Sequence, residues 1–125
     1  MDVGERIEAL SQVASSLRSL HSRGFVFGDL RAPNLMVRVN RAGYDSDNRI
    51  AVQDRVTVKL VDFEFCCRAG QPWPKVMYNT DLQYPKVLLD AMADSTKEWP
   101  TMEVCHDWEM LRSLSDWIIS IMPSL

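Results

Sequence analysis

The stretch "FGDLRAPN", residues 27–34, decides how the rest of the chain is interpreted. It follows a short apolar run, and its glycine and proline are typical of a loop that leaves a strand. Two interpretations fit. In the first, the stretch is a turn in which Asp29 and Asn34 satisfy nearby backbone groups. In the second, it is a phosphoryl-transfer loop with Asp29 as the base and Asn34 as a metal ligand.

The residues before this stretch predict an amphipathic helix over residues 4–22, because their apolar side chains recur at spacings of three and four. These side chains are Ile7, Leu10, Val13, Ala14, Leu17 and Leu20. Asp2 and Glu5 can form an N-terminal capping pair, and Gly24 is a typical helix stop. Residues 25–27 then predict a short strand that leads into the loop.

The residues after the stretch predict a β-hairpin. Residues 35–39 and 56–61 are both short, largely apolar runs rich in β-branched side chains, as strands are. Residues 40–55 between them are polar and predict a solvated connection or an extension of the hairpin. Asn34 then lies where the hairpin begins and Asp62 where it ends.

The second half of the chain is less regular. Residues 66–101 show no clear period, and only residues 82–92 within them favour a short helix. Residues 102–121 return to helical spacing and predict a second long helix. Residues 1–125 therefore predict one α+β domain, mainly helical, with a short β-hairpin.

Polar side chains lie at the ends of all three predicted strands. Asp29 follows the first, Asn34 opens the second and Asp62 follows the third, so loops leaving rigid strand ends present them at one rim. Phosphoryl transfer needs a carboxylate near the attacking hydroxyl, oxygen ligands for magnesium, and positive charge near the phosphate. Together with Arg31, these residues supply that set.

Three stretches in order resemble the C-terminal lobe of the protein-kinase-like superfamily. "GDLRAPN" is similar to the catalytic loop His-Arg-Asp-Leu-x-x-x-Asn, "LVDFEF" to the strand and Asp-Phe-Gly element, and "HDWEMLRSL" to the start of the central helix. The resemblance covers roughly residues 5 to 121. The variants look most like divergent fungal protein-kinase-like proteins, and more distantly like choline and aminoglycoside kinases.

The resemblance implies a role for each of these residues. Asp29 would be the catalytic base, and Arg31 would contact the γ-phosphate. Asn34 and Asp62 would bind the cofactor Mg-ATP as magnesium ligands. Asp107 would hold the catalytic loop through its backbone. The acceptor would be a hydroxyl, with a protein serine or threonine favoured over a small alcohol.

The chain also departs from the family pattern. Phe27 replaces the usual His and is expected to pack in the same apolar column. Gly28 replaces the Arg that pairs with a phosphorylated activation loop, so switching by that route is not expected. Glu64 replaces a Gly whose backbone conformation a residue with a side chain adopts only with strain, so we expect backbone strain at Glu64. No Ala-Pro-Glu triplet closes the irregular segment.

The largest departure is that nothing in residues 1–125 resembles the N-terminal lobe, with its Gly-rich loop and its lysine. The chain alone is therefore expected to be a very poor kinase, active only if completed by that lobe. The alternative is a pseudokinase or truncated remnant that binds a partner through an exposed apolar rim at Phe25, Phe27 and Phe63. An unrelated α+β binding domain remains a third interpretation.

Composition excludes several other classes. The net charge is -3, with acidic and basic residues mixed, so neither a nucleic acid nor a membrane surface is an expected partner. The first residues lack a signal-peptide pattern, and the late apolar run is too short to span a bilayer. The sequence therefore predicts an intracellular protein, cytoplasmic or nuclear.

The remaining chemistry-bearing residues predict structural roles. The three cysteines, Cys66, Cys67 and Cys105, fit no zinc spacing and are expected to be reduced, buried thiols. His21 is expected to stabilise the helix end, where a cation is favoured. The four tryptophans are expected to pack in the core rather than form a stacking platform.

Overall fold

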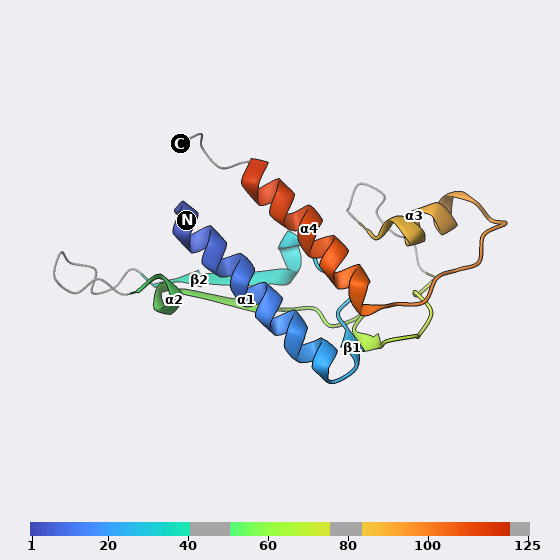
Figure 1. The fold of residues 1–125 in the computed structure, drawn as a ribbon, viewed down its shortest axis with the longest axis horizontal. Helices are drawn as coiled ribbons and strands as arrows, with labels where there is room; N and C mark the ends of the chain where they lie inside the picture. Colours follow the sequence, from blue (N-terminus) through green and yellow to red (C-terminus); the bar gives the residue numbers. More distant parts are fainter. Residues whose placement is uncertain (41–50, 76–83, 121–125) are drawn as a thin grey trace.

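The computed structural model describes residues 1–40, 51–75 and 84–120, and shows an α+β fold (Figure 1). Its elements are α1 (Val3–Ser22), β1 (Phe25–Val26), the 3-10 helix η1 (Ala32–Asn34), β2 (Leu35–Val39), α2 (Val52–Arg55), β3 (Val56–Leu60), β4 (Cys67–Arg68), α3 (Lys86–Ala93) and α4 (Val104–Ser120). Both long helices, the hairpin and a short helix near residues 82–92 are thus confirmed. Part of the polar connection and part of the irregular segment lie outside the described residues.

The predicted capping pair starts α1. The Asp2 carboxylate accepts a hydrogen bond from the Glu5 backbone N–H at 2.7 Å, and Glu5 Oε2 accepts one from the Asp2 N–H at 3.2 Å. These bonds satisfy two of the N–H groups that a helix start leaves without a partner. At the other end, Gly24 has a φ of 82° and donates to the His21 carbonyl. Glycine allows this left-handed turn, which directs the chain into β1.

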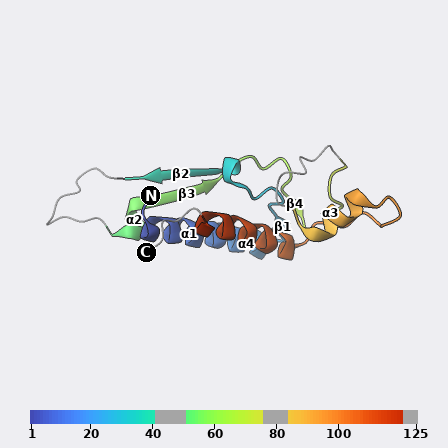
Figure 2. The ribbon, with the colours of Figure 1, turned by 90° about the horizontal axis from the view of Figure 1, so that it is seen from above.

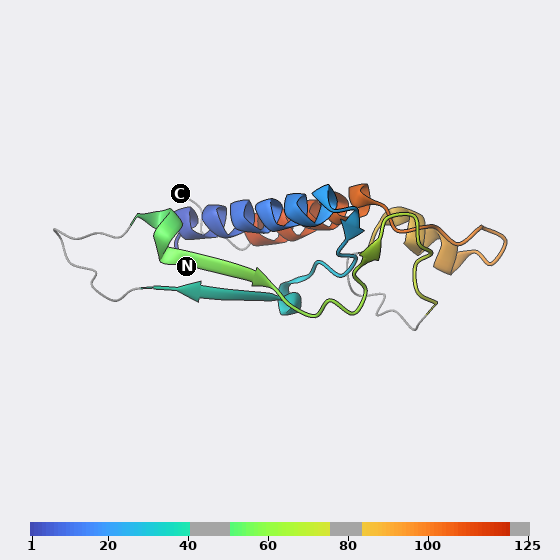
Figure 3. The same ribbon diagram turned by 90° about the horizontal axis from the view of Figure 1, so that it is seen from below.

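The hairpin of β2 and β3 packs along α1. The strands are antiparallel, with Leu35 opposite Leu60 and Val39 opposite Val56. Gln12 on α1 joins helix to sheet: its Nε2 donates to the Val56 carbonyl at 2.6 Å, and its Oε1 accepts from the Val58 N–H at 2.8 Å. A side-chain amide therefore pairs with the β3 backbone where a further strand would otherwise bind. Figures 2 and 3 show β3 on the helix side of the hairpin.

The helix α4 lies beside α1, and the core forms between these helices, the hairpin and β1 (Figure 1). The buried apolar side chains include Val13, Leu17, Val26, Phe27, Leu30, Val58, Trp73, Leu88, Met102 and Met110. Trp73 is buried, and Trp99 and Trp108 pack against this core, as predicted. The Trp117 side chain lies outside the described part.

Two elements of the structure were not predicted. The short helix α2 forms inside the expected polar connection, where Arg55 Nε lies 3.1 Å from Glu5 Oε1 and ties it to the start of α1. The strand β4 forms inside the irregular segment, because Phe25 and Val26 of β1 pair with Arg68 and Cys67. Both depend on contacts with residues distant in sequence, which local patterns do not carry.

The prediction for the cysteines is correct in one part and wrong in another. All three are free thiols. Cys66 and Cys67 are only half-buried, and burial raises the pKa of both thiols. Cys105 is exposed. Among the described residues, each helix is too short or too polar to cross a lipid bilayer.

Candidate functional site

The loop between β1 and β2 carries the first three predicted site residues. Pro33 lies inside η1, where a fixed φ suits the start of a helical turn. Asn34 ends that turn and is buried. Its Nδ2 donates to the Asp29 carbonyl at 2.9 Å, so the amide closes the loop on itself and leaves Oδ1 as the free acceptor. Asp29 and Asn34 are therefore held in fixed positions relative to each other.

Asp29 is only 6% exposed, and its carboxylate pairs with Arg31. The Arg31 Nε lies 3.1 Å from Asp29 Oδ1. Because Arg31 is half-buried, its guanidinium reaches from solvent to the carboxylate. The pair places a negative and a positive charge side by side, two residues apart in the chain.

Tyr84 is a site residue that the sequence did not indicate. Burial raises the pKa of its phenol, the Asp29 charge raises that pKa further, and Arg31 partly offsets the shift. Its phenol therefore lies close enough to feel both charges of the pair. Tyr84 is distant in sequence and precedes α3, so a local pattern offers no signal for it.

Asp62 reaches the same end of the hairpin as Asn34. The Val61 N–H donates to the Asn34 carbonyl at 2.9 Å, which extends the β2–β3 pairing by one step and sets Asp62 just beyond it. Asp62 is exposed and has a φ of 64°, a left-handed conformation that is unfavourable for a side chain other than glycine. Such strain is concentrated at functional positions in proteins.

The prediction of backbone strain at Glu64 is wrong. Among the described residues, Asp62 is the one non-glycine residue with a positive φ. The left-handed turn thus occurs two residues earlier than expected, directly after the hairpin. Glu64 is exposed and adopts no such conformation.

Asp107 on α4 fixes the backbone of the candidate loop. Its carboxylate is fully buried and accepts hydrogen bonds from the Phe27 and Gly28 N–H groups, each at 2.8 Å. The contact that the resemblance implies is therefore present. His21 Nε2 lies 2.8 Å from the same carboxylate, and its ring packs edge-on against Trp108. His21 is structural, as predicted, and the contact that the structure shows joins the end of α1 to α4 through Asp107.

Gly28 is a second position that the sequence did not single out for packing. Its φ is 80°, and a Cβ there would lie 2.1 Å from Met102 Cε, a buried side chain. The left-handed backbone favours glycine, and any larger residue would also have to displace the end of the Met102 side chain. The sequence signal for this close packing is the position of Gly28 between a strand and Asp29. From the sequence, Gly28 was expected only to remove an arginine from the loop.

The expected apolar rim is smaller than predicted. Phe27 is fully buried, as an apolar column requires, so it is not part of an exposed rim. Phe25 is half-buried and lies under the Arg68 guanidinium, 5.2 Å from the ring centre. Phe63 is 50% exposed, and its ring centre lies 5.2 Å from that of Phe27.

The donor atoms at the end of the hairpin fit magnesium. Asn34 Oδ1 and the Asp62 carboxylate are hard oxygen ligands, which Mg²⁺ prefers. Among the described residues, no group of three or more His, Cys, Asp or Glu side chains could hold a metal by itself. The site can therefore supply only part of an octahedron, which suits an ion whose other ligands are phosphates and water.

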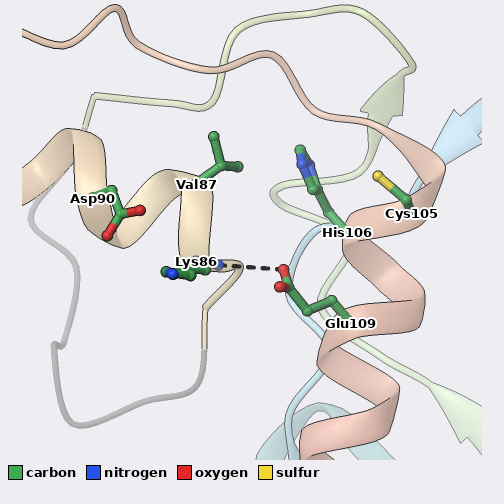
Figure 4. A pocket seen from close by; sticks show the side chains of 6 residues that line it. All are labelled: Lys86, Val87, Asp90, Cys105, His106 and Glu109. Carbon is green, nitrogen blue, oxygen red and sulfur yellow. Dashed lines mark hydrogen bonds between the residues drawn. The ribbon is translucent and has the colours of Figure 1, made fainter.

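A separate cavity of about 490 Å³ lies between α3 and α4 (Figure 4). His106 faces it, but its Nδ1 already accepts hydrogen bonds from Trp73 Nε1 and the Glu103 N–H. Glu109 Oε2 accepts from the Lys86 N–H at 3.3 Å and joins the two helices. Among the described residues, Cys105 and the cavity's acidic side chains are not part of a group that could hold a metal.

No family model matches the chain, and no solved structure matches it. The functional interpretation therefore rests on the residues and their contacts.

Proposed function

We propose that this chain is the C-terminal half of a protein-kinase-like phosphotransferase site that uses Mg-ATP. The observation that carries the proposal is the convergence of Asn34 and Asp62 at one end of the hairpin, with Asp29 bonded to Asn34 through its carbonyl. Phosphoryl transfer depends on positioning and charge rather than on covalent chemistry. A rigid loop with these side chains meets that need.

In this proposal, Asp29 accepts the proton of the attacking hydroxyl. Its Oδ1 faces Arg31, and its other oxygen is the one that would receive the proton. Arg31 supplies positive charge beside the carboxylate, where the transferred phosphate would lie. Magnesium, when bound, would neutralise phosphate charge, and Asn34 and Asp62 would hold it. The acceptor is a hydroxyl, with a protein serine or threonine favoured.

The buried Asp107 carboxylate supports the proposal through the backbone. It fixes the Phe27 and Gly28 N–H groups, directly before Asp29, at 2.8 Å each. A catalytic carboxylate must be held within a fraction of an ångström of its working position. Asp107 acts as a positioning residue and does not touch the substrate.

Residues 1–125 contain no Gly-rich phosphate loop and no lysine in a Val-Ala-Ile-Lys context. Efficient transfer would therefore require a second lobe to complete the ATP site. A non-catalytic binding role is the second candidate. The close Arg31–Asp29 pair favours it, because a neutralised carboxylate on a residue that is only 6% exposed is poorly placed to receive a proton.

A thermal-shift titration with Mg-ATP tests the proposal. Ligand that binds only the folded chain raises the melting temperature by mass action. We expect a magnesium-dependent shift that Asp62→Ala abolishes and that Asp116→Ala, an exposed aspartate on α4, retains. An unchanged shift in Asp62→Ala would reject the metal assignment. No shift in the unsubstituted protein would favour the non-catalytic role.

A further inference from the structure

A second, unrelated feature of the fold is a small groove where α1, β2 and α4 meet, with a volume of about 240 Å³. Its apolar wall comes from all three elements. The apolar residues that line the groove are Ala9, Leu35, Val37, Leu114 and Ile118, together with two neighbours, Met1 and Ala32. Arg6 of α1 is the one charged side chain among the described lining residues. We call this site the Arg6 groove.

The Arg6 guanidinium has a buried nitrogen atom, Nη1, that lacks a hydrogen-bond partner among the described residues. Arg6 as a whole is half-buried. A buried polar atom without a partner is costly, and nearly all such atoms in proteins are satisfied. The groove therefore has one unsatisfied guanidinium nitrogen beside an apolar wall.

The strand that borders the groove has a free edge. β2 pairs with β3 on one side, and within the described part of the chain no strand pairs with its other side. Val37 is 42% exposed on the groove face and Met36 is 63% exposed on the opposite face. A free strand edge with exposed apolar side chains can accept an extended segment as an additional strand.

We propose that the Arg6 groove docks an extended segment of another protein, which adds to the edge of β2 and places a carboxylate on Arg6. Successive side chains of a strand point to opposite faces, and this alternation sets the sequence pattern of the docked segment. An acidic and an apolar side chain two positions apart enter the groove. The residue between them covers Met36 on the opposite face. A small ligand is disfavoured, because its sites usually measure about 300–1,000 Å³.

Charge complementarity is the reason for choosing this occupant. The described lining residues offer one cationic side chain and no acidic one, so a carboxylate compensates it, whereas a neutral segment would leave Arg6 Nη1 unsatisfied. This docking role is independent of phosphoryl transfer.

Selection from a random-peptide library displayed on phage, with the folded chain as bait, tests the proposal. Enriched peptides should contain an acidic residue with an apolar residue two positions away. Their affinity should fall about 10- to 100-fold in Arg6→Met and in Arg6→Gln, because a charge-assisted bond is lost. Arg18→Met, an exposed arginine of the same helix, should bind as the unsubstituted protein does.

A second readout separates binding from a structural role. Removing a guanidinium with an unsatisfied buried nitrogen should raise the melting temperature of free Arg6→Met, whereas removing a fully satisfied arginine would lower it. The proposal is overturned by a lower melting temperature, by selected peptides without an acid, by no enrichment, or by equal affinity for Arg6→Met. Sedimentation that shows a dimer dissolved by Arg6→Met would overturn it in favour of a second copy.

Discussion

Replacing Asp107 by asparagine should destabilise the fold far more than its size suggests. The carboxylate uses Oδ1 for the Gly28 N–H and Oδ2 for both the Phe27 N–H and His21. Asparagine keeps the shape but has one acceptor oxygen and one donor nitrogen. Whichever way the amide turns, one buried backbone N–H faces another donor.

The cost follows from those contacts. An unsatisfied buried N–H costs about 1–3 kcal/mol, and a hydrogen bond to a charged group contributes about 1.5–3 kcal/mol. We therefore expect Asp107→Asn to lose about 2.5–6 kcal/mol, a large share of the roughly 5–15 kcal/mol typical of a domain. At about 2.1 cal/mol/K per residue, 125 residues give an unfolding entropy near 0.26 kcal/mol/K, so the melting temperature should fall by about 10–23 °C.

Urea denaturation followed by circular dichroism measures the free energy of unfolding directly. Asp116→Asn is the matched control, because Asp116 lies on the same helix but is exposed, and we expect it to change stability by less than about 0.5 kcal/mol. A loss below about 1 kcal/mol in Asp107→Asn would show that the buried carboxylate does not hold the loop.

Three further substitutions have sharp expectations. Gly28→Ala should cost about 2 kcal/mol more than Gly24→Ala in urea denaturation, because both have left-handed backbones but only the first meets Met102; equal losses would contradict the close approach. Burial lowers the pKa of His106 below its ordinary value of 6.5, so the unfolded chain binds the proton first and stability should fall as the pH drops through about 6.5. His106→Asn should weaken that pH dependence, and an unchanged profile from pH 7 to 5 would rule His106 out as its source. Asp62→Gly should match or exceed the original stability, within about 1 kcal/mol, while losing Mg-ATP binding; a large loss would mean that the left-handed turn needs the carboxylate.

The sequence was sufficient for the elements with strong local signals. The capping pair of Asp2 and Glu5, the apolar face of α1 and the β-branched runs of β2 and β3 are local, and the structure places them as expected. The common end of the hairpin follows from the same pattern, because Asn34 and Asp62 flank two paired strands.

The remainder depends on contacts between distant residues. The buried state of Phe27, the tie from Arg55 to Glu5 and the approach of Tyr84 to Asp29 each join separate parts of the chain. The left-handed backbone fell on Asp62 rather than Glu64, because the turn directly follows the last hairpin hydrogen bond. Neither periodicity nor composition specifies where such a turn begins.

The most direct test of the central claim uses Mn²⁺ as a paramagnetic substitute for Mg²⁺, added with ATP to isotope-labelled protein. Nuclear magnetic resonance then reports which backbone amides lie near the ion. The account predicts selective broadening of the backbone amides of residues 34–35 and 61–63, absent in Asp62→Asn and retained in Asp116→Asn. Broadening elsewhere, or none at either segment, would contradict a phosphoryl-transfer site at this end of the hairpin.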